Sequence, residues 1–364
     1  MEGVKIKSFS ILQEKRRKEM LDRNRQRRDE MIAKRREKVL LAVDETQSVR
    51  MVEETKRKPE ALKDLERRRR FSSTLCLPEW MIEIPPDLNA NWLVMPRPEG
   101  KRYILSSKRG KTILRSVNGY SKVVKSNLPG SVLNYRGNCV FDVILSDNSV
   151  FVMDVIYFNN VDYSESEAES RLFTVTSRLS EDNYFLLYQD RRFPIIPIPY
   201  SSCDVPSLLS FYSWNANIPL NGLLFVEYGF SRRFGRIEEG STPLQLLWKD
   251  SHCSQYFIDT DATGKVRDIQ EVTLLYKDHT LVSIEGIGVM DVTLPEIDDD
   301  SLVHCSIQGV SYNTATSSWV MEGVQVLGYA SFAKTLPDTL SKIVFQHMAR
   351  YHPLTILLCT HTRR

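Results

Sequence analysis

The chain has 364 residues, is 42% hydrophobic and carries a formal net charge of +3, as expected of a globular protein with one large domain or two medium ones. It has no run of 18 apolar residues, and its Glu- and Lys-rich N-terminus lacks the apolar core of a secretory signal, so we expect neither a membrane span nor export. Its six cysteines are far apart without CxxC or zinc spacing, which indicates free thiols in a reduced, cytosolic or nuclear protein.

The charge is unevenly distributed along the chain. Residues 1–70 carry 23 Lys and Arg against 14 Asp and Glu, whereas the remainder carries 26 against 32. A basic arm on a mildly acidic body indicates an arm that meets an acidic partner, a nucleic acid or a membrane.

Residues 13–43 contain no Gly or Pro and are rich in helix-forming residues, so they predict a helix. Apolar residues are few and basic ones occupy several faces. We therefore expect a helix that cannot bury itself in its own domain and that folds on an acidic, concave partner. Residues 1–12 read as a docking peptide or as a frayed terminus.

The basic helix resembles the importin-β-binding segment of nuclear import adaptors, which carries clustered Arg and Lys and ends in a KRR-type triplet. A solvated charged helix or an RNA-binding arm remains an alternative. Residues 44–75 predict a linker with a second basic cluster, Arg67–Arg70. The resemblance implies that the importin contacts are Arg16, Arg17, Arg27, Arg28, Lys34, Arg35 and Arg36.

From Leu77 the pattern changes to short apolar strands separated by turn residues. Residues 139–145 and 150–158 predict a hairpin, in which Asp142 and Asp154 are expected on opposite sides as structural residues. Asp204 and Pro206 predict the start of a helix over 204–213. Residues 221–228 predict a buried strand.

The order of these segments resembles the cap-binding domain of the snurportin family, adaptors that carry spliceosomal ribonucleoproteins into the nucleus. The resemblance implies an α/β (α+β) nucleotidyltransferase-like fold with antiparallel sheets, shared with mRNA-capping guanylyltransferases and DNA ligases. It is carried, across about residues 77–250, by the segments LPEWMIEIPPDL, PEGKRYIL, FDVI with VFVMDVIYF, SRLF, NGLLF and GSTPL followed by Trp248.

The related enzymes use a K-x-D-G-x-R motif whose lysine attacks the nucleotide phosphate. Arg97 stands at that lysine's position, and a guanidinium stays protonated and has no lone pair for attack. Lys101 would point to the opposite side. Asn221 replaces the acid of the enzymes' D-G strand. We therefore expect a binding protein without catalytic residues, metal or cofactor; a capping guanylyltransferase-like enzyme is the alternative.

A methylated guanine is cationic and stacks well on indole. The resemblance implies that Trp80 lies edge-on beside the methyl groups and that Trp248 stacks on the base, although a one-residue shift places Leu247 at the family position. Gly100, Lys101 and Arg102 match contacts to the cap triphosphate. Two further contact positions depart from the family, with Pro78 replacing a serine and Val117 a lysine.

Residues 251–336 predict several short strands, followed by a helix from about Pro337 to Arg350. This β-rich extension resembles the OB-type lid of capping enzymes without the lid's arginines and aspartate. The expected domains are an arm (1–43), a linker (44–75), a cap-binding domain (76–250), the extension (251–350) and a tail (351–364). The expected partners are trimethylguanosine-capped small nuclear RNA or its ribonucleoprotein, importin-β and an exportin through residues 1–12, in a chain that shuttles between cytoplasm and nucleus.

Overall fold

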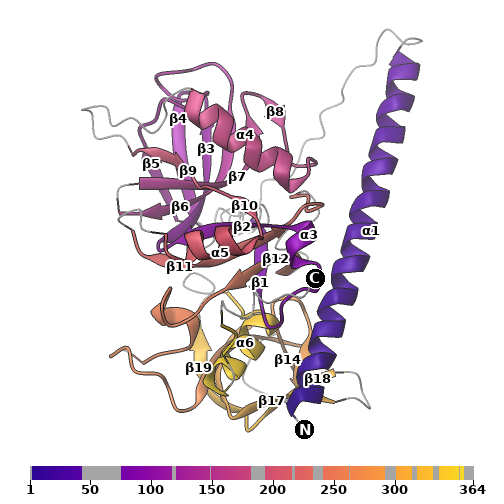
Figure 1. Cartoon of the computed structure of the whole chain (residues 1–364), viewed down its shortest axis with the longest axis vertical. Coiled ribbons are helices and arrows are strands. Elements are labelled where there is room, and N and C mark those ends of the chain that lie inside the picture. Colours follow the sequence, from indigo (N-terminus) through magenta and orange to yellow (C-terminus); the bar gives the residue numbers. More distant parts are fainter. Residues whose placement is uncertain are drawn as a thin grey trace, which may run out of the picture.

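A computed structural model describes residues 2–42, 75–116, 120–147, 149–181, 193–214, 218–232, 241–261, 263–291, 301–313, 318–330, 336–351 and 353–355. Within helix α1 (Glu2–Ala42), the side chains described are those of residues 13–34. Figure 1 shows two β-rich parts stacked along the long axis, with α1 standing alongside both.

The first sheet has the strand order β1-β12-β11-β2-β10. Strand β1 pairs parallel with β12, and the other neighbours are antiparallel. One face of this sheet packs on a core that contains Trp92, Phe225 and Trp248, together with helices α3 (Leu88–Asn91) and α5 (Val205–Tyr212). The strands are β1 (Leu77–Trp80), β2 (Trp92–Pro98), β10 (Ser201–Ser202), β11 (Leu220–Glu227) and β12 (Ser241–Trp248).

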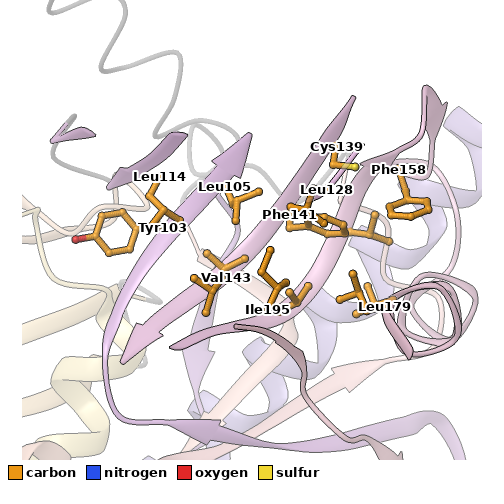
Figure 2. Close-up of a cluster of buried hydrophobic side chains, with 14 of the residues drawn as sticks. Tyr103, Leu105, Leu114, Leu128, Cys139, Phe141, Val143, Phe158, Leu179 and Ile195 are labelled. Atoms are coloured by element: carbon orange, nitrogen blue, oxygen red, sulfur yellow. The ribbon is translucent and has the colours of Figure 1, made fainter. Parts of the chain in front are cut away.

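The second sheet has the order β5-β4-β3-β6-β7-β8, with β9 pairing parallel to β7. The apolar side chains of one face form a core with α4 (Ala168–Glu181). Figure 2 shows this core, in which Leu179 of α4 lies near Phe158 and Ile195 of the sheet. The strands are β3 (Lys101–Lys108), β4 (Lys111–Ser116), β5 (Ser121–Val124), β6 (Cys139–Ser146), β7 (Ser149–Phe158), β8 (Val161–Asp162) and β9 (Ile195–Pro197).

The C-terminal part contains a third sheet of order β15-β14-β13-β16-β19 and a separate hairpin, β17-β18. Helix α6 (Leu340–Tyr351) packs Ile343, Val344 and Phe345 into the core of this sheet. A 3₁₀ turn, η2 (Gln255–Phe257), precedes the strands of this sheet in the chain. The strands are β13 (Gln270–Lys277), β14 (Thr280–Val282), β15 (Gly288–Asp291), β16 (Ser301–Ile307), β17 (Gly309–Asn313), β18 (Ser318–Glu322) and β19 (Gln325–Ala330).

The predicted fold class is confirmed. The chain combines α and β structure with antiparallel sheets, a basic N-terminal helix and a β-rich C-terminal part. The hairpin β6-β7 lies where the alternating pattern predicts it. Asp204 caps α5 by accepting a hydrogen bond from the Ser207 amide. None of the helices in the described part of the chain has an apolar stretch long enough to cross a membrane. The five described cysteines are buried and free.

The prediction that the basic helix cannot bury itself in its own domain is wrong. Helix α1 lies against β12 and β17 and buries Gln13, Arg17, Met20 and Asn24, which are spaced along one helical face. Hydrophobic periodicity missed this face because three of its four residues are polar. The helix docks through matched polar partners on the body rather than through an apolar stripe.

The expectation that Asp142 and Asp154 face opposite sides is also wrong. Register shifts between Val140 and Phe141 and between Asp142 and Val143 bring the two aspartates directly opposite each other. A β-bulge places an extra residue in one strand, so residues that would alternate by simple counting from the turn can pair directly and point to the same side. Both carboxylates therefore lie in the space between the two large sheets.

Candidate functional site

The first two sheets face each other across a cleft that is lined by both charged and apolar side chains. The cavity that remains in it is about 20 Å³, room for one or two water molecules. The Oε1 atom of Gln245, a residue only 3% exposed, faces this lining without a hydrogen-bond partner among the described residues. The charged lining residues are Arg97, Arg102, Asp142, Asp154, Arg171 and Arg232.

The two aspartates hold three of the four arginines of the cleft. Asp142 accepts hydrogen bonds from Arg102 at 2.9 Å and from Arg232 at 2.8 Å. Asp154 accepts from Arg171 at 2.9 Å and from Arg232 at 3.3 Å. Burial alone would raise the pKa of Asp142, but the guanidinium groups of Arg102 and Arg232 outweigh burial and lower the pKa to about 2. The network keeps an excess of positive charge in the cleft.

Arg97 is the residue at which the sequence analysis expected the lysine of a K-x-D-G-x-R motif to be replaced. Its guanidinium donates a hydrogen bond to the side-chain oxygen of Asn221, whose amide nitrogen donates to Glu99. Burial, reinforced by the charge of Arg102, lowers the pKa of Arg97 to about 10, so the group is still a cation at neutral pH. The structure thus brings Arg97 of β2 and Asn221 of β11 into direct contact.

Lys249, directly after β12, is the functional candidate that sequence reasoning missed. Its Nζ atom lies 5.3 Å from the centre of the Trp80 ring, within cation–π range. Burial, and then the charge of Arg97, lowers the pKa of Lys249 to about 7. The available signal was its position directly after Trp248, a residue that the sequence analysis had singled out.

Trp80 is half-buried between the first sheet and the C-terminal part. Its ring centre lies 5.0 Å from that of Phe345 in α6, and its backbone amide donates to Ser341 at 3.0 Å. The indole therefore contacts Lys249 and an apolar side chain of α6 at once. This position joins the charged end of the cleft to the C-terminal sheet.

Trp248 does not offer a ring face to a ligand in this structure. It is fully buried, and its indole nitrogen donates to the carbonyl of Leu354 at 2.9 Å. Side chains alternate along a strand, so the neighbouring Leu247 points to the other face, where it lies near Gly222. The buried position of Trp248 argues against the expected stacking role.

The Gly-Lys-Arg corner divides its side chains between the two faces of β3. Gly100 has φ 149°, and a side chain there would meet the Leu145 carbonyl oxygen at 2.6 Å, so only glycine fits. Arg102 points into the cleft, whereas Lys101 is exposed and lies near the rings of Tyr103 and Tyr120.

Pro78 and Val117 are the two remaining positions that were expected to contact the cap. Pro78 lines the cleft between the two large sheets, beside Gln245 of β12. Val117 lies outside the described residues.

Several arginines expected to bind importin contact the body. Arg16 pairs with the buried Glu79 at 2.7 Å, and Arg28 pairs with Glu167 at 2.7 Å. Arg17 lies 3.5 Å from Asp87 and 5.0 Å from the Trp92 ring centre. Of the remaining expected contacts, Arg27 is half-buried, Lys34 is exposed, and the side chains of Arg35 and Arg36 lie outside the described residues.

Residues 74–249 match the family model described as Snurportin1, m3G cap-binding domain. The matched span contains both facing sheets and the cleft. In the described part of the chain, no group of three or more His, Cys, Asp and Glu residues is placed to hold a metal ion.

Among solved structures, the chain is similar to several DNA ligases. A mycobacterial DNA ligase D complexed with ATP and MES has 9% identity and a TM-score of 0.34, over 73% of this chain and 99% of that one. The ligase domain of LigD from M. tuberculosis has 9% identity and a TM-score of 0.33, over 72% and 98%. Chlorella virus DNA ligase-adenylate has 12% identity and a TM-score of 0.32, over 68% and 96%. Likeness at these scores assigns no activity to this chain.

Proposed function

We propose that the chain is a nuclear import adaptor of the snurportin family, which binds the trimethylguanosine cap of small nuclear RNA through residues 74–249 and importin-β through α1. The observation that carries the proposal is the match of these residues to the m3G cap-binding domain, because the span includes the complete cleft. Shuttling between cytoplasm and nucleus, and recycling by an exportin through residues 1–12, belong to the same proposal.

The cleft supports binding of a phosphate-bearing ligand better than group transfer. Arg97 is a cation at the nucleophile position and is hydrogen-bonded to Asn221. Lys101, the alternative nucleophile, lies on the outer side of β3 near Tyr120. A positively charged, partly desolvated site favours a triphosphate because charge-assisted hydrogen bonds are strong there.

In the proposed complex the cap triphosphate contacts Arg97, Lys249 and the backbone at Gly100, and the methylated base lies against Trp80. Phosphates would draw the Lys249 ammonium away from the indole that it contacts in this structure. The vacated ring face could then receive the cationic guanine. The small cavity implies that the cleft residues rearrange as the cap enters.

The arm of the proposed adaptor cannot contact the body and importin-β with the same side chains at once. Arg16, Arg17 and Arg28 are held by Glu79, Asp87 and Glu167. Importin binding would therefore compete with docking, and the affinity observed for importin-β would be reduced by the fraction of docked arm.

The proposal is tested by titrating the full chain with m3GpppG, m7GpppG and GTP while following tryptophan fluorescence. We expect m3GpppG to bind more tightly than GTP, and the relative affinity of m7GpppG to report the preference between cap types. Equal affinity for GTP and both caps would overturn cap recognition.

A second assay addresses the enzyme alternative by incubating the chain with labelled GTP. A stable protein–GMP adduct that is lost on substitution of Lys101 or Lys249 would establish a guanylyltransferase-like enzyme instead. Lys249 is included because its buried amine, with a pKa of about 7, is the better nucleophile of the two.

A further inference from the structure

A long segment of the second sheet is free of acidic residues. Between Gly100 and Phe141 the chain has nine Lys and Arg and no Asp or Glu, whereas the rest of residues 71–364 has 17 Lys and Arg against 32 Asp and Glu. Strands β3, β4 and β5, which this segment forms, lie at one edge of the sheet. Figure 1 shows this edge on the opposite side of the molecule from α1.

The structure assigns to this edge a second role, as the surface that receives the single-stranded RNA leaving the cap. We name it the basic edge. This inference rests on the proposed cap-binding function and extends it to the nucleotides that follow the cap. The basic edge consists of Lys101, Lys108, Arg109, Lys111, Arg115 and Lys122.

The basic edge begins beside the cleft. Lys101 directly follows Gly100 and lies 5.6 Å from the ring centre of Tyr120, which is 59% exposed. Strand β3 then runs for eight residues, about 26 Å at roughly 3.3 Å per residue, to the hairpin tip at Lys108 and Arg109. This length suits a few nucleotides, near the lower end of single-strand site sizes of about 4–16.

Two positive charges at the hairpin tip repel each other and destabilise the hairpin. Lys108 and Lys111 are directly opposite each other across β3 and β4, and both are exposed. Like charges in directly opposed positions destabilise a sheet, and a bound polyanion removes the repulsion. Arg115 lies on the face that Arg102 shares, and Lys122 lies on the other face, so the cations surround the edge.

Aromatic rings accompany the cations. Tyr135 is 68% exposed and lies over the hairpin turn, where a side chain at Gly110 would meet its ring at 3.2 Å. Tyr120 stands at the other end beside Lys101. Exposed rings among cations fit single-stranded nucleic acid, whose bases stack while its phosphates are neutralised. An acidic protein would use the cations and leave the rings without a role.

The test compares m3GpppG with an m3G-capped RNA of ten nucleotides, at about 50 mM and about 200 mM salt. We expect the longer RNA to bind at least tenfold more tightly at low salt, with an advantage that shrinks as salt rises, by a slope of about −0.7 for each phosphate neutralised. Lys108→Ala combined with Lys111→Ala should remove most of the advantage while leaving m3GpppG affinity unchanged. These variants should fold, because they remove repulsion.

The matched control removes two exposed lysines of the C-terminal part, with Lys265→Ala combined with Lys277→Ala. Retained RNA affinity in this control supports the basic edge, and an equal loss would overturn it. The inference also fails if the ten-nucleotide RNA binds no more tightly than m3GpppG. Absence of m3GpppG binding would instead overturn the cap-binding proposal.

Discussion

The ammonium nitrogen of Lys249 lies 5.3 Å from the centre of the Trp80 indole, and this contact links the two halves of the proposed cap site. The lysine belongs to the charged group that would hold phosphates, and the indole to the surface that would hold the base. A ligand that carries both a phosphate and a methylated base can give Lys249 and Trp80 a new partner each when they separate. Free phosphate would give one only to Lys249, and free base only to Trp80.

Lys249→Met should weaken m3GpppG binding at pH 6.5 by about tenfold, the value of one charge-assisted hydrogen bond. It should also flatten the pH dependence of stability. The folded pKa of Lys249, about 7, is below the ordinary value of 10.5. Between these values the unfolded chain binds more protons, so wild-type stability rises with pH by up to about 1.4 kcal/mol per unit. Urea unfolding at pH 7, 8 and 9 measures the slope, and an unchanged slope in the variant contradicts the assignment.

Trp80→Ala should weaken m3GpppG binding by roughly 1–3 kcal/mol, because it removes the proposed ring contact. Trp248→Phe should leave cap affinity unchanged, because Trp248 is buried away from the cleft. Fluorescence titration of both variants separates the two tryptophans. A loss of cap affinity in the Trp248 variant without loss of stability would restore its stacking role.

Asp142→Asn should destabilise the fold by about 3–5 kcal/mol, because it removes the buried carboxylate that pairs with Arg102 and Arg232. The folded pKa of Asp142, about 2, lies below the ordinary 3.8, so its stabilising contribution is present above about pH 4 and is lost as pH falls toward 2. Chemical unfolding at pH 7 and pH 3 should show the variant's deficit shrinking at pH 3. A constant deficit would exclude the ionic explanation.

Releasing the arm should strengthen importin-β binding. Asp87→Ala combined with Glu167→Ala removes the partners of Arg17 and Arg28, and we expect the affinity for importin-β to rise several-fold. Cap affinity should stay unchanged, because neither acid lines the cleft. Biolayer interferometry with immobilised importin-β measures the change. The exposed Asp162→Ala and Glu181→Ala serve as a charge-matched control, and an equal gain there would reject competition.

Local signals in the sequence predicted much of the fold. Alternation gave the β6-β7 hairpin, and Asp204 with Pro206 gave the start of α5. The side on which Asp142 lies could not be read in this way, because bulges in the hairpin change the register without changing the residue pattern. In the C-terminal part, the helix expected from about Pro337 to Arg350 is α6, and residues 251–336 contain short strands such as β13, β18 and β19.

The candidate site was predicted less completely. The contact between Arg97 and Asn221 follows from two substituted motifs, but pairing of distant strands decides that they touch. Trp248 has the residue type expected of a cap ligand, but its place on β12 buries its ring, and the residue type alone does not reveal this. The docking of α1 depends on acids at positions 79, 87 and 167, which lie in three separate segments and show no common pattern in the sequence.

Several buried polar atoms of α1 have no hydrogen-bond partner among the described residues, and those of Asn24 are among them. Asn24 is only 1% exposed, and neither its amide oxygen nor its amide nitrogen has a partner among the described residues. Each such group costs about 1–3 kcal/mol relative to its hydrated state. This cost weakens the docking of α1 against the body, so the helix is released more easily. A leucine at this position would avoid the cost and strengthen the docking of the arm. A protein that binds the released arm would then bind it less readily.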